Sequence, residues 1–146
     1  MYNAKLSKVI ENLDNFIDFQ VKYNHLYSGG CCWSAFCLAS ELEKRNIPYD
    51  VVSYSNYGED DMPELEDICK SGELTHVGIV VDGKEIGSDE ILINDVEEGY
   101  YSVNLHITNA DELLNMYNTG NWNPRYDTGN NDFIRNKIMD IFSEMD

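Results

Sequence analysis

Residues 29–48 read GGCCWSAFCLASELEKRNIP, and the rest of the chain is organised around this stretch. The paired glycines allow a sharp backbone turn, and Cys31 and Cys32 follow in the first turn of a predicted helix that ends at Asn46. The N-terminus of a helix carries unpaired N–H groups and a positive partial charge, which together stabilise a thiolate. The stretch therefore predicts a helix that presents a reactive thiol at its start.

Length and composition predict a single domain over residues 1–146. The chain has 146 residues, of which 42% are hydrophobic, and this is enough to bury a core without disulfide bonds. No apolar run is long enough to span a membrane, and no secretory leader follows Met1. We therefore expect a cytoplasmic protein with no membrane partner.

The cysteines indicate free thiols rather than a disulfide framework. Three of the four, Cys31, Cys32 and Cys37, fall on one helix, and the fourth is Cys69. No Cys-x-x-Cys pair is present, so a structural zinc site is not indicated. We predict reduced thiols, no metal and no organic cofactor, and we interpret Cys37 as a small buried apolar residue.

The formal net charge of −17 narrows the choice of partners. Direct binding of nucleic acid is disfavoured because phosphate contacts depend on Lys and Arg. A basic protein surface is a better match for such a charge. The acidic run over residues 59–67 is interpreted as a solvated surface within an insertion over residues 55–73.

Periodicity and turn signals predict an α+β fold. In chain order they indicate a helix over 5–21, the cysteine helix, strands over 49–54, 74–81, 84–89 and 100–108, a helix from Asn109 to Asn118, and a last helix capped by Asn131. The cysteine helix is expected to pack on an antiparallel sheet, with the N- and C-terminal helices around it.

The dipeptide Asp82-Gly83 is the strongest hairpin signal in the chain, so residues 84–89 are expected to pair with residues 74–81. Alternation along the first of these two strands divides its side chains between the two faces of the sheet. His76, Gly78 and Val80 fall on one face, and Val77, Ile79 and Val81 fall on the other.

Three side-chain types needed for thiol catalysis occur in an informative order. A cysteine nucleophile needs a base that shares its proton, and the base needs a third group that holds its ring. Cys31 or Cys32, then His76, then Asp89 supply these groups, and the hairpin returns Asp89 beside His76. Backbone N–H groups at the start of the cysteine helix are candidate oxyanion donors.

The arrangement resembles the papain-like cysteine peptidases, and more closely their transglutaminase-like branch, including the small single-domain members of bacteria and phages. The matching residues are Gly29-Gly30-Cys31, Ala35, Leu38, Leu42, Asn46-Ile47-Pro48, His76, Asp82-Gly83-Lys84 and Asp89, within residues 29–90. The resemblance implies a papain-like fold and a thiol hydrolase or acyl transferase. Such an enzyme acts on an amide, either a peptide bond or a glutamine side chain, through a thioester and without a cofactor.

Two registers of the resemblance select different nucleophiles. The spacing to Ala35 and to Ile47-Pro48 selects Cys31, whereas the Cys32-Trp33 dipeptide, typical of papain-type enzymes, selects Cys32. We favour Cys31 and keep Cys32 as the alternative.

The chain departs from the family pattern at two places. The branch often has a tryptophan two residues after the histidine, where this chain has Gly78. Papain-like enzymes carry a glutamine six residues before the nucleophile, where this chain has His25 before Cys31 and Leu26 before Cys32. We leave the side-chain oxyanion donor unassigned.

A different class of function also fits the sequence. An acidic binding or inhibitor protein uses its charge to occupy a basic groove on another protein, imitating nucleic acid, and its cysteine site is vestigial. In that interpretation the thiols are core residues, His76 is a satisfied strand histidine and Asp89 begins a turn. A third possibility keeps the fold but only binds peptides.

Overall fold

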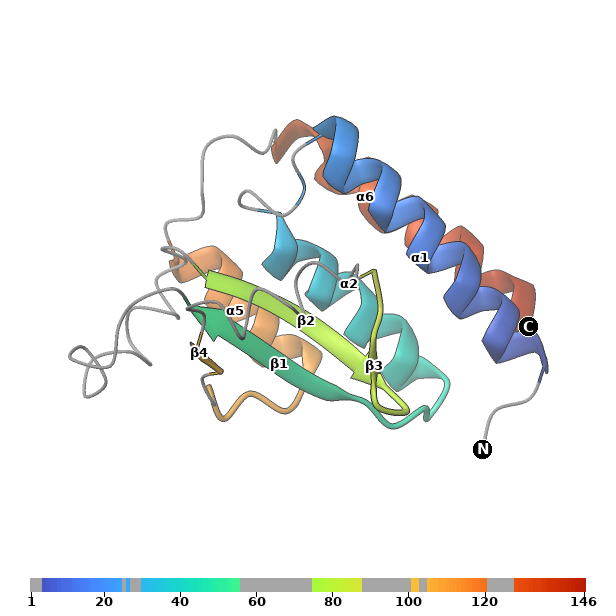
Figure 1. The fold of residues 1–146 in the computed structure, drawn as a ribbon, viewed down its shortest axis with the longest axis horizontal. Coiled ribbons are helices and arrows are strands. Elements are labelled where there is room, and N and C mark those ends of the chain that lie inside the picture. The colour runs from blue at the N-terminus through green and yellow to red at the C-terminus, as the bar shows by residue number, and fades with distance from the viewer. Residues whose placement is uncertain are drawn as a thin grey trace.

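The computed structural model describes residues 4–24, 26, 30–55, 75–87, 101–102, 105–120 and 128–146. These ranges contain α1 (Ala4–Asn24), α2 (Cys31–Lys44), β1 (Asp50–Ser55), β2 (Thr75–Val81), β3 (Lys84–Glu85), β4 (Tyr101–Ser102), α5 (Ala110–Thr119) and α6 (Asn131–Phe142), with short 3₁₀ turns at Thr128–Asn130 and Ser143–Met145. The predicted mixture of helices and an antiparallel sheet is confirmed (Figure 1).

The sheet has the order β3-β2-β1-β4 among the described strands, and every neighbouring pair is antiparallel. β1 pairs with β2 along its whole length, which sets Tyr54 opposite His76 and Val52 opposite Gly78. β3 pairs with the end of β2, where Val80 faces Glu85. The candidate histidine therefore lies on a central strand of the sheet.

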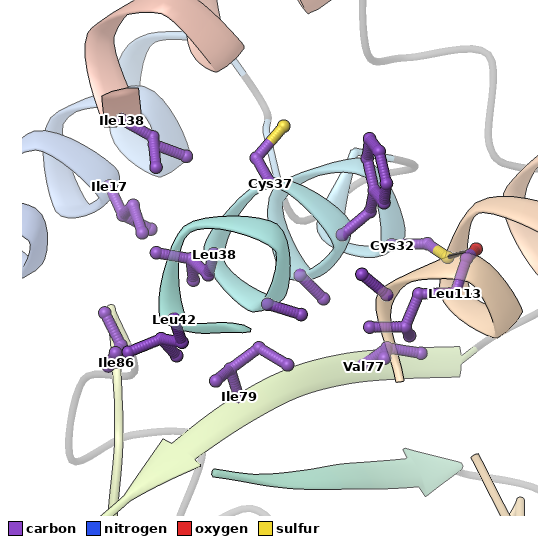
Figure 2. Packing of buried hydrophobic residues seen from close by; sticks show 14 of the residues in the cluster. Ile17, Cys32, Cys37, Leu38, Leu42, Val77, Ile79, Ile86, Leu113 and Ile138 are labelled. Carbon is purple, nitrogen blue, oxygen red and sulfur yellow. Dashed lines mark hydrogen bonds between the residues drawn. The ribbon is translucent and has the colours of Figure 1, made fainter. Parts of the chain in front are cut away.

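Helix α2 lies between the sheet and the α1–α6 pair (Figure 1). Leu42 of α2 lies beside Ile79 of β2 and Leu38 lies toward Ile17 of α1, as Figure 2 shows, and these side chains are buried in one core. Replacing one such leucine with alanine typically costs about 2–5 kcal/mol. This packing fixes α2, and with it the cysteines at its first turn, against the sheet.

Alternation along β2 follows the expectation from the sequence. Val77, Ile79 and Val81 belong to the hydrophobic core. The intervening residues His76 and Gly78 are also buried, on the other face of the strand.

Three local signals in the sequence are confirmed. Asn46 has a φ of 55° just after α2, and Asp82 and Gly83 have φ values of 54° and 78°, as a tight two-residue hairpin turn requires. The side chain of Asn109 caps α5, since its oxygen accepts a hydrogen bond from the backbone N–H of Glu112 at 2.9 Å.

The predicted return strand over 84–89 is confirmed at Lys84–Glu85, and residues 88–89 lie outside the described residues. After Glu85 the N–H of Ile86 still donates to the carbonyl of Ile79 on β2 at 2.8 Å, and the chain turns at Ile86 and Gly87. Gly87 has a φ of 77°, a conformation that a strand does not use and that glycine adopts readily.

Two further boundaries differ from the prediction. Among the described residues of the strand expected over 100–108, Tyr101–Ser102 pair with β1, and residues 105–108 are irregular, with a φ of 55° at His106. Asn131 is the first residue of α6 rather than its cap, and its side-chain amide donates to the Tyr117 hydroxyl at 2.8 Å.

None of the described helices combines the length and hydrophobicity that a bilayer span requires.

Candidate cysteine–histidine site

Cys31 is the first residue of α2, as the glycine pair predicts. Gly30 precedes it as the N-cap, its N–H donates to the Leu26 carbonyl at 2.6 Å, and its own carbonyl accepts from the Ser34 N–H at 3.0 Å. These two bonds fix the start of the helix. They place Cys31 where the helix dipole is positive.

His76 lies near the start of β2, at the same end of the fold as the N-terminus of α2 (Figure 1). Of the groups that raise the pKa of His76, the Cys31 side chain has the largest effect, through a side-chain hydrogen bond. The structure therefore brings together two of the residues selected from the sequence, although 45 positions separate them in the chain. Both are buried, with 1% of Cys31 and 8% of His76 exposed.

Glu85 is the carboxylate that contacts His76. Its Oε2 lies 2.6 Å from Nε2 of the imidazole, and only 7% of the residue is exposed. The sequence analysis assigned the orienting role to Asp89, which lies outside the described residues. Glu85 was missed, although the two-residue turn at Asp82-Gly83 pairs it with Val80 and so puts it on the His76 face of the hairpin.

Gly78 leaves the space that the Glu85 side chain occupies. A Cβ atom at Gly78 would lie 2.6 Å from Cδ of Glu85 and 3.0 Å from its Cγ. The Glu85 side chain thus crosses directly over Gly78 on its way to His76. The glycine that departs from the family pattern is therefore required by the carboxylate beside it.

The electrostatic setting of His76 favours the protonated imidazole. Burial by itself lowers the pKa of His76, but hydrogen bonds to Cys31 and Glu85 and the Coulombic attraction of both raise that pKa to about 9. The imidazole is therefore positively charged at neutral pH.

Tyr54 covers one side of the imidazole. The two rings are stacked, with centroids 6.1 Å apart and an interplanar angle of 9°. Burial and the nearby Glu85 carboxylate both raise the pKa of Tyr54, so its phenol stays neutral. The aromatic ring restricts the orientations open to His76.

Cys32 and Cys37 project from α2 in two different directions, Cys32 toward Leu113 of α5, as Figure 2 shows. The Cys32 sulfur donates a weak hydrogen bond to the carbonyl of Leu113 on α5 at 3.5 Å, and burial and the neighbouring Cys31 raise its pKa. Burial raises the pKa of Cys37 to about 12. Both thiols are therefore protonated core groups, and Cys31 is the thiol that meets the histidine.

The remaining residues singled out from the sequence divide into two sets. Leu26 is fully buried in the core and offers no side-chain donor. His25, Cys69, Asp89 and the acidic run 59–67 lie outside the described residues. Within the part of the chain that the structure describes, no three His, Cys, Asp or Glu side chains gather into a metal-binding cluster.

Comparison of the chain with protein-family models, with curated proteins and with solved structures finds no match. The function proposed below therefore rests on the geometry of the site.

Proposed function

We propose that this protein is a papain-like, cysteine-dependent hydrolase or acyl transferase that acts on an amide. The observation that supports the proposal is the hydrogen-bonded series from Cys31 to His76 to Glu85. In this series Cys31 is the nucleophile, His76 is the general acid and base, and Glu85 orients the imidazole.

The chemistry needs only these groups and an amide substrate. The Cys31 thiolate attacks the carbonyl carbon, and N–H groups at the N-terminus of α2 stabilise the oxyanion that forms. As the C–N bond breaks, His76 gives its proton to the departing amine and a thioester remains. Water or a second amine then attacks the thioester, His76 takes up the proton, and the thiolate leaves.

Glu85 fixes which imidazole nitrogen takes part. The carboxylate engages Nε2, so we assign the proton exchanged with Cys31 to Nδ1, the other ring nitrogen. A buried carboxylate and a buried imidazolium each lose hydration, and their mutual attraction offsets that loss at a separation of 2.6 Å. Asp89 stays a prediction for an additional carboxylate.

The burial of Cys31 has a kinetic consequence. With 1% of the residue exposed, a reagent reaches the sulfur only when the surrounding structure opens locally. Small electrophiles should therefore react faster than bulky ones. The same opening must admit an amide substrate.

Alkylation of each cysteine by iodoacetamide, followed by mass spectrometry across pH 5 to 10, tests the proposal. We expect Cys31 to react at neutral pH about tenfold or more faster than Cys32 and Cys37, because burial raises the pKa of the other two. A His76→Ala variant should remove this difference. If Cys31 in the folded parent reacts no faster than Cys32, the catalytic proposal is wrong.

A second candidate is an acidic binding or inhibitor protein with a vestigial cysteine site. The net charge of −17 and the burial of Cys31 favour it. Titration with oligolysine at low and high salt tests this function. Binding that weakens steeply with salt and is unchanged in Cys31→Ala supports it, whereas no binding at low salt rules it out.

A further inference from the structure

Helix α1 contacts the hairpin on both sides of Glu85 through a single carboxylate. Oδ1 of Asp14 accepts a hydrogen bond from the backbone N–H of Gly87 at 2.7 Å. Its Oδ2 accepts from the Lys84 ammonium, also at 2.7 Å. Lys84 immediately precedes Glu85 and Gly87 follows two residues later, so both ends of this short segment are tied to α1.

The packing beside Asp14 is equally close. A Cβ atom at Gly87 would lie 2.5 Å from Cγ2 of Ile17 and 2.9 Å from its Cβ. Ile17 lies one turn after Asp14 on α1, so the glycine lets the hairpin approach the helix closely enough for Asp14 to reach the Gly87 N–H. Substituting Gly87 would also strain its backbone, which has a φ of 77°.

We infer that Asp14 is a positioning residue for the Cys31–His76–Glu85 site. It has no direct contact with the reacting groups in this arrangement and acts through the backbone of β3. β3 contains only two residues, and its pairing with β2 continues in a bond from the Ile86 N–H to the Ile79 carbonyl at 2.8 Å, so β2 holds this segment from one side. The Asp14 contacts hold the segment from Lys84 to Gly87, and the Glu85 side chain is thereby kept over Gly78 and against His76.

The positioning role of Asp14 rests on the proposed function only in what it implies for catalysis. Its effect on the pKa of His76 does not depend on that function. Without Asp14, Glu85 moves away from His76 and the pKa of the imidazole falls toward its ordinary value of 6.5. A residue that merely stabilises the fold would lower the stability without changing that pKa.

NMR titration of His76 in a graded series of variants tests the inference. Asp14→Ala removes both contacts, Asp14→Asn keeps an acceptor for Gly87, and Lys84→Ala removes only the exposed ion pair. We expect the His76 pKa to fall by about one unit or more in Asp14→Ala and by less in the other two. Asp18→Asn is the matched control, because Asp18 lies on the same helix and pairs only with Lys22 among the described ion pairs.

The outcomes separate the two proposals. An unchanged His76 pKa in folded Asp14→Ala overturns the positioning role, whatever the reactivity of Cys31. If Asp14→Ala does not fold, the pKa in Asp14→Asn decides, and a value equal to that of Asp18→Asn overturns the role. If the pKa falls as expected but Cys31 is unreactive in the parent, the positioning role stands and the catalytic proposal fails.

Discussion

Cys31 and Cys32 are adjacent in the same helical turn, yet they lie in two different regions of the molecule. Cys31 meets a protonated histidine and, through it, a carboxylate. Cys32 enters the apolar contact between α2 and α5, where its strongest partner is a backbone carbonyl. The helix N-terminus is common to both, so it does not by itself make a thiol reactive. The difference comes from the side chain that each sulfur meets across the fold.

The largest effect is expected from filling the space above Gly78 that the Glu85 side chain occupies. Gly78→Val puts atoms where the Glu85 carboxylate now lies, so it both overpacks the site and displaces a buried charge from its partner. We expect a loss of about 3 kcal/mol or more in the free energy of unfolding, measured by urea denaturation.

Gly83→Ala is the control for that substitution. No atom lies within 4 Å of a Cβ at Gly83, so only its positive φ is penalised. We expect a loss of about 1 kcal/mol. Equal losses in the two variants would show that Gly78 is not needed for Glu85.

The next effect concerns pH. The pKa of His76 in the folded protein, about 9, lies above the ordinary value of 6.5, so between these two pH values the native state binds more protons than the unfolded chain. The stabilisation is fully present below about pH 6.5, falls as pH rises, and is lost above about pH 9. Over this window we expect a difference of a few kcal/mol between the parent and His76→Gln.

His106→Gln is the matched control for the pH experiment, because His106 is exposed. We expect the difference in the free energy of unfolding from the parent to change less over this window for His106→Gln than for His76→Gln. A parent whose stability does not fall between about pH 6.5 and pH 9 relative to His76→Gln would contradict a charged, paired His76.

A smaller effect is expected for the carboxylate. Glu85→Gln keeps the size of the side chain but removes its charge, which is one of the causes that raise the His76 pKa. We expect the iodoacetamide rate of Cys31 at neutral pH to fall about tenfold, while the rates of Cys32 and Cys37 stay low. An unchanged rate would mean that Glu85 does not take part.

The smallest effect is expected for Cys32, the thiol that does not meet the histidine. Cys32→Ala removes a buried sulfur and its weak bond to Leu113, so we expect a loss of about 1 kcal/mol in stability. The alkylation rate of Cys31 should not change. A loss of Cys31 reactivity in this variant would show that the two thiols are one functional unit.

The sequence predicted the features that depend on nearby residues. Gly30 before Cys31, the turn at Asp82-Gly83 and the cap at Asn109 each act within a few positions, and each is found where expected. The approach of the cysteine helix to His76 also followed from the order of the elements.

The identity of the orienting carboxylate depended on strand register. An unbroken two-residue hairpin pairs His76 with the residue at position 89, which is why Asp89 was selected. Gly87 departs from the regular strand conformation, and Glu85 reaches His76 because Gly78 has no side chain. Neither feature has a local sequence signal strong enough to override the regular pattern.

The choice between the two thiols also required the fold. Both sit in one turn of one helix, and adjacent residues differ by about 100° around its axis. The packing of α2 against the sheet and α5 decides which of the two side chains meets the histidine. The sequence motifs alone selected both thiols as candidates.

NMR titration of the His76 imidazole tests the central claim most directly, because it does not require a substrate or an exposed thiol. We predict a midpoint near pH 9 in the parent and a lower midpoint in both Cys31→Ala and Glu85→Gln, since each removes one of the groups that raise the pKa. A parent midpoint at or below 6.5, or one that neither substitution changes, would contradict a hydrogen-bonded series from Cys31 through His76 to Glu85.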